Sequence, residues 1–74
     1  MRGSTIEIRF GIIAVKMGFI TAEQLVEALR IQVMGNIEQG EHKLIGTILL
    51  ERGLITSEQI DEVVKELVKK GKSE

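Results

Sequence analysis

The chain has 74 residues, of which 43% are hydrophobic and 28% charged, so we expect one folded domain and no extended disordered segment. Ten basic and eleven acidic residues give no electrostatic attraction toward nucleic acid or an anionic membrane. The absence of cysteine excludes disulfides and thiolate metal sites, and no apolar run reaches the roughly 20 residues of a membrane span. We therefore expect a cytoplasmic protein, and we assign no role to residues 1–4, which lack the apolar stretch of a signal peptide.

Two helices are predicted in the first half of the chain, over residues 6–17 and 22–38. The first is apolar and ends at Gly18, because glycine readily takes the left-handed conformation that terminates a helix. The second begins after Thr21, whose hydroxyl suits an N-cap, and Gln24 follows three residues later as in a capping box.

The second half of the chain is predicted to contain helices over residues 43–52 and 57–70. The first of these stops at Gly53, and the second is capped by Thr56. A polar linker precedes them over residues 34–43, and a charged tail closes the chain over residues 69–74.

The two halves are copies of one pattern. Residues 11–33 and 46–68 share nine identical positions at an offset of 35, and the matches include the glycine stops and the threonine caps. One helical hairpin cannot bury its apolar stripe alone, so the two are expected to pack together. The predicted fold is therefore all-α: two tandem helix–turn–helix hairpins, repeat one at 9–33 and repeat two at 44–68, packed as a single four-helix domain with a pseudo-two-fold internal repeat.

The helical spacing of the apolar residues predicts both the core and an interaction surface. The expected core comprises Ile13, Val15, Ile20, Leu25, Leu29, Ile48, Leu49, Ile55, Ile60, Val64 and Leu67. Four further apolar residues of the second helix lie off its main stripe, and we expect them to form a homodimer or partner surface: Val26, Ile31, Val33 and Met34.

Other function classes find little support in the sequence. The only histidine, His42, lies in the polar linker, so neither catalysis nor a metal site is expected. A DNA-recognition helix needs basic or amide side chains at its start, but the capped helices open with Glu23 and Glu58, which repel phosphate. The 35-residue period is similar to that of tetratricopeptide repeats, but their tryptophan, tyrosine and proline signature is missing.

The repeat resembles a known module. The first copy carries Arg9-Phe10-Gly11, then Gly18, Ile20-Thr21, Leu25, Ala28, Leu29 and Gln32. This order is similar to that of the N-terminal domain of type II secretion and type IV pilus assembly ATPases, which is a bacterial module. The second copy departs from it, because Leu44 and Leu67 stand where the arginine and the glutamine belong. The ATPase itself is absent, since there is no GxxxxGK[ST] loop.

Some members of that family bind cyclic di-GMP through two such motifs. The resemblance implies that the ligand contacts would be Arg9, Phe10, Gly11, Gln32 and Gly46. Arg9 would stack on or bond a purine, and Gly11 would let a phosphate approach the backbone at a helix start. The sequence thus predicts a non-catalytic helical interaction or regulatory module, without a cofactor, that binds a protein partner or itself. The alternative is a cyclic di-GMP sensor.

Overall fold

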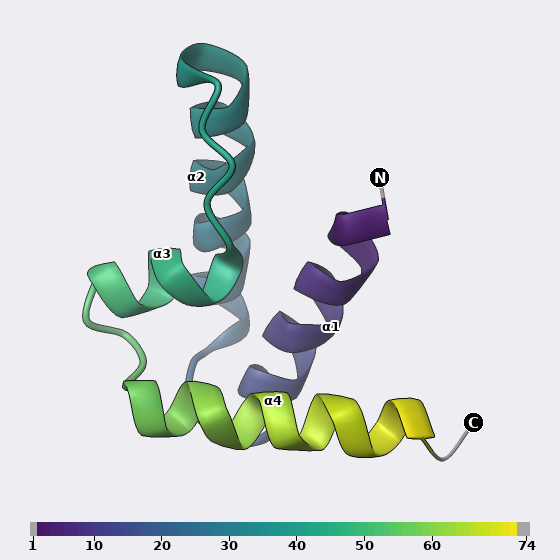
Figure 1. Ribbon diagram of the computed structural model, residues 1–74. Coiled ribbons are helices and arrows are strands. Elements are labelled where there is room, and N and C mark those ends of the chain that lie inside the picture. The colour runs from purple at the N-terminus through teal and green to yellow at the C-terminus, as the bar shows by residue number, and fades with distance from the viewer. Residues whose placement is uncertain (1, 73–74) are drawn as a thin grey trace.

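The computed structural model describes residues 2–72, with side chains described for residues 6–69, and this part of the chain is helical without strands (Figure 1). The helices are α1 (Arg2–Lys16), α2 (Ala22–Gln39), α3 (Ile45–Glu51) and α4 (Ser57–Lys72). The predicted all-α, four-helix fold is confirmed. Within residues 2–72, none of the helices combines the length and the apolar character needed to cross a membrane.

The glycine stops are confirmed in both repeats. Gly18 and Gly53 have φ angles of 81° and 73°, the left-handed region that a β-carbon disfavours. The residue after each glycine donates its amide to the carbonyl five residues earlier, at 3.0 Å and 2.9 Å. This bond satisfies a carbonyl at the helix end that would otherwise lack a donor, so each first helix stops at the same point of the repeat.

Both capping boxes are also confirmed. The Thr21 hydroxyl accepts a hydrogen bond from the Gln24 amide at 3.1 Å, and the Gln24 side chain accepts one from the Thr21 amide at 2.9 Å. Thr56 and Gln59 make the same pair of bonds at 3.1 Å and 3.0 Å. The start of each second helix is thus determined by residues within one turn of it.

The boundaries that depend on less local signals differ from the prediction. Helix α1 already includes residues 2–4, to which the sequence assigned no role. Helix α2 ends at Gln39, one residue beyond the predicted end, and Gly40 with a φ of 67° is its C-cap. Helix α3 begins at Ile45 and not at residue 43.

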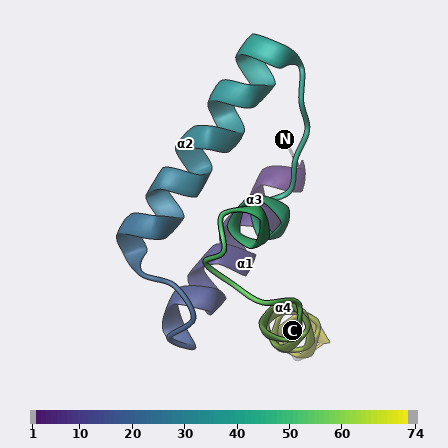
Figure 2. The same cartoon turned by 90° about the vertical axis from the view of Figure 1, so that its left-hand side faces the viewer.

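The second helix of each repeat packs on the first helix of the other repeat. Helix α4 lies across α1, while α2 contacts α3, and α1 and α3 contact each other (Figures 1 and 2). Helix α1 also contacts α2 within the first repeat. The exchange between repeats is consistent with a pseudo-two-fold relation, and the core lies where α1 and α3 meet.

The core is close to the predicted one, with an informative difference on α4. The buried apolar side chains are Phe10, Ile13, Ala14, Ile20, Leu25, Ala28, Ile45, Ile48, Leu49, Ile55 and Val63. The prediction is wrong at Val64, whose exposed fraction is 42%, whereas that of Val63 is 0%. Four other predicted core residues are only partly buried: Val15, Leu29, Ile60 and Leu67. Helix α4 faces α1 with Val63 at the centre of the contact, which turns Val64 to the edge.

Candidate functional site

A polar cluster joins α1, α2 and the start of α3. The Glu7 carboxylate accepts hydrogen bonds from the Gln32 side-chain amide at 3.0 Å and from the backbone amide of Ile45. The Gln32 amide also donates to the carbonyl oxygen of Lys43 at 2.9 Å. Since the N-cap residue Leu44 makes no side-chain cap bond, Glu7 supplies the acceptor that the first turn of α3 needs.

This cluster gives Gln32 a role in holding the fold together. Its amide, predicted as a ligand contact, bridges two segments that meet α2, and it would have to break these bonds to reach a ligand. Sequence reasoning missed Glu7. A signal was present, because Glu7 lies three and seven residues before the buried Phe10 and Ala14, on the same face of α1. A carboxylate on an apolar stripe usually has a partner.

The prediction that Gly11 lies at a helix start is wrong. Gly11 is in the interior of α1, where helical hydrogen bonds occupy the backbone amides, and it is buried. A β-carbon at this position would collide with the side chain of Leu25. The glycine therefore permits close approach of α1 and α2.

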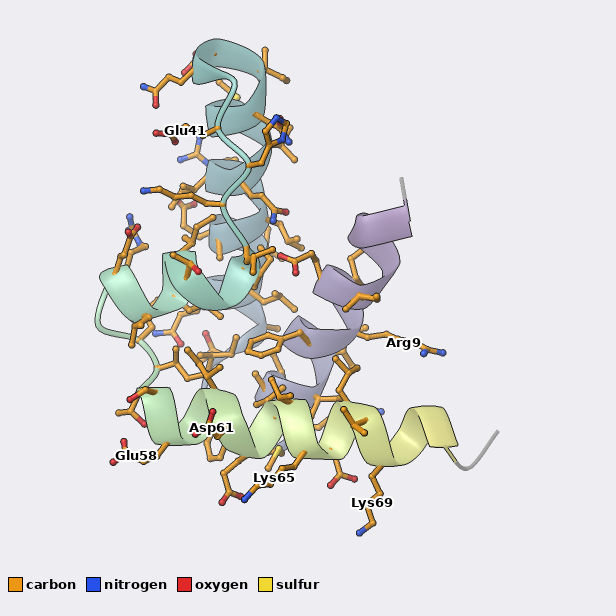
Figure 3. The ribbon with its side chains drawn as sticks, in the orientation of Figure 1. Arg9, Glu41, Glu58, Asp61, Lys65 and Lys69 are labelled. Carbon is orange, nitrogen blue, oxygen red and sulfur yellow. The ribbon has the colours of Figure 1, made fainter. Side chains whose placement is uncertain are left out.

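Phe10 and Gly46 are two predicted contacts that the structure brings together. The Phe10 ring is buried and lies over Gly46, so that a β-carbon on this glycine would be 3.3 Å from the ring. Arg9, by contrast, is exposed and extends outward from α1 (Figure 3). The five predicted contacts thus do not line one cavity: Phe10 and Gly46 share a groove, and Arg9, Gly11 and Gln32 lie outside it.

This groove, the apolar groove hereafter, lies between α1, α3 and α4 and has a volume of about 270 Å³. Its lining consists of Ile6, Glu7, Phe10, Leu44, Gly46, Thr47, Leu50, Ile60, Val64 and Leu67. Apolar side chains on its rim face solvent, including Ile6 and Leu44 with exposed fractions of 57% and 60%. Its one charged residue is Glu7, so the groove suits apolar groups and repels an anionic nucleotide.

The outer surface of α2 carries the other predicted interface. Val26, Val33 and Met34 are exposed as expected, and Ile37 extends the strip, but Ile31 packs against the core. This α2 strip runs along one helix, and none of its residues lines the groove described above.

Two surface ion pairs involve residues that line other hollows on α2 and α3. Beside α3, Lys43 and Glu51 pair at 3.0 Å, and the hydrogen bond and charge of Glu51 raise the pKa of Lys43. On α2, the hydrogen bond and charge of Arg30 lower the pKa of Glu27. Such pairs keep both partners ionised and solvated, and a general acid or base would need the opposite environment. Among the described residues no group of three or more histidine, cysteine, aspartate or glutamate side chains is placed to hold a metal ion.

Comparison of the chain with protein-family models, with curated proteins and with solved structures gives no significant match. The surfaces of the fold itself, chiefly the apolar groove and the α2 strip, are therefore the basis for inferring a function.

Proposed function

We propose that the protein is a non-catalytic helical interaction module of the cytoplasm, of the kind found at the N-terminus of secretion and pilus assembly ATPases, and that it binds a protein through the apolar groove. The observation that supports this proposal is the groove itself. It combines a buried aromatic floor with exposed apolar side chains on its rim. Surfaces of this kind are covered by a partner in most soluble proteins that carry them.

The shape of the groove favours an apolar segment as its occupant. Its walls are helices, and Gly46 lets the Phe10 ring pack closely against α3 at the floor of the groove. An amphipathic helix that places one or two apolar residues over this ring would exclude water from the rim. The few polar groups that line the groove give little basis for recognising a charged small molecule.

Peptide selection against the full chain tests this proposal. A display library of amphipathic helices should yield binders to the parent protein, and these should not bind a variant carrying Leu44→Glu and Leu50→Glu, which makes the rim acidic. A matched control is Val26→Glu on the α2 strip, which should leave binding unchanged. Selection of no helical binders, or of binders indifferent to the rim substitutions, would refute the proposal.

The second candidate function is cyclic di-GMP sensing. One observation favours it: the Arg9 guanidinium reaches out from α1 into solvent (Figure 3), where a ligand could meet it. A nucleotide at 100 times its dissociation constant would stabilise the protein by about 2.7 kcal/mol. A thermal shift with cyclic di-GMP that Arg9→Ala abolishes would support this candidate. No shift at millimolar ligand would remove it and leave the interaction module.

A further inference from the structure

Helix α4 exposes an apolar strip that continues from the apolar groove. Ile60, Val64 and Val68 follow one another at four-residue spacing on one side of the helix, and the last two are exposed. Ile60 and Val64 also line the groove. The C-terminal end of α4 extends past α1 (Figure 1), and Val68, at the end of this strip, is 52% exposed.

The charges beside this strip change sign along the helix. Asp61 precedes Lys65 along the edge of α4 nearest the strip (Figure 3), while Glu58, Glu62, Glu66 and Lys69 lie further round the helix. A second α4 laid antiparallel reverses the order, so that Asp61 of each helix comes near Lys65 of the other. The strip and its charged edge are therefore complementary to themselves.

We propose that the protein forms a two-fold symmetric dimer in which α4 packs antiparallel against α4 of a second copy. A two-fold axis beside Val64 places this residue against the partner's Val64. Ile60 and Val68 lie four residues to either side of Val64, so Ile60 meets the partner's Val68 and Val68 meets the partner's Ile60. Asp61 then lies within reach of the partner's Lys65, and symmetry forms this ion pair twice.

The α2 strip is a poorer surface for a second copy. It is bordered by Glu23, Glu27 and Glu38, and its one basic neighbour, Arg30, already pairs with Glu27 at 3.0 Å. Self-pairing through α2 would bring acidic edges together, whereas within residues 6–69 neither Asp61 nor Lys65 is engaged in an ion pair. Charge complementarity thus favours α4.

This dimer rests on the proposed function, because it names a second copy as an occupant of the surface beside the apolar groove. Sedimentation equilibrium of the full chain over a wide concentration range tests it. The parent should dimerise, and Asp61→Lys should weaken the dimer about tenfold or more, because two ion pairs become repulsive. The double variant Asp61→Lys with Lys65→Asp should recover the parental dissociation constant. The matched control is Glu62→Lys, which changes a charge on the side of α4 away from the strip. This variant should leave the dissociation constant of the dimer close to the parental value.

The absence of cysteine in the chain allows a second measurement. Val64→Cys should oxidise to a disulfide-linked dimer, because the two copies of this residue meet at the axis, whereas Glu62→Cys should not. A chain that sediments as a monomer at all concentrations, or a dimer that responds to Val33→Glu but not to the Asp61 and Lys65 exchange, would overturn the proposal. A monomer that still selects helical peptides in its groove would refute the dimer alone, and failure of both tests would refute the proposed function too.

Discussion

Removing the Glu7 carboxylate should destabilise the domain more than any other single change to a charged side chain on its described surface. Glu7→Ala takes the acceptor away from the Ile45 amide, which belongs to a residue with an exposed fraction of 0%, and from the Gln32 side chain. A buried donor left without an acceptor costs about 1–3 kcal/mol, and a lost helix cap costs about 1 kcal/mol. Since these two costs overlap at Ile45, we expect Glu7→Ala to lower the free energy of unfolding by about 2–3 kcal/mol.

Urea unfolding followed by circular dichroism measures this loss, and in a domain of this size it corresponds to a fall in melting temperature of about 10 °C or more. Glu7→Gln keeps an acceptor oxygen and should cost roughly 1 kcal/mol. Glu38→Ala, which removes an exposed carboxylate from α2, should stay within about 0.5 kcal/mol of the parent. If Glu7→Ala unfolded at the same urea concentration as Glu38→Ala, the cap would have no energetic role and the reasoning would be refuted.

Three further substitutions test the packing. Gly53→Val should lower the free energy of unfolding by about 1 kcal/mol or more, because valine disfavours the left-handed backbone, and an unchanged urea midpoint would contradict this. Gly11→Ala should cost about 1–3 kcal/mol through its collision with Leu25, although alanine is intrinsically the better helix former; a stabilised variant would show that α1 and α2 are not held so closely. Val63→Ala should be clearly more destabilising than Val64→Ala in chemical unfolding, and the reverse order would mean that α4 is rotated.

The features predicted correctly from the sequence depend on signals within one turn of the chain. A glycine at a helix end and a threonine followed three residues later by glutamine act through bonds to their immediate neighbours, so both repeats could be located in advance. Which apolar residue of α4 points to the centre of the core is a different question. Val63 and Val64 both belong to a helical apolar stripe, and only the angle at which α4 crosses α1 decides between them.

The position of Glu7 on the apolar stripe indicates that its carboxylate has a partner, but the partners themselves could not be located from the sequence, because they are far from Glu7 in the chain. The carboxylate and the Ile45 amide are separated by 38 positions, and no local rule connects a glutamate in one helix with the start of another. Gly11 was misplaced for a related reason. The resemblance suggested a role in ligand binding, whereas a glycine inside a helical pattern also marks a close contact between helices, as it does here against Leu25.

The exposed apolar surfaces follow from an inequality between the two repeats. Each second helix packs on the first helix of the other repeat, but the first helices differ in length, with 15 residues in α1 and 7 in α3. At 1.5 Å per residue, α3 spans only about 10 Å, while the 18 residues of α2 span about 27 Å. The C-terminal part of α2 therefore extends beyond α3, which leaves the apolar side chains there, including Val33 and Ile37, exposed. The same short helix leaves the rim of the apolar groove open at Leu44 and Leu50, which lie at its two ends. A symmetric four-helix domain of two equal hairpins would close over both surfaces. Here the shortened α3 leaves apolar surface that another protein chain can bury, and the apolar groove that we propose as the interaction site lies where the two repeats differ in length.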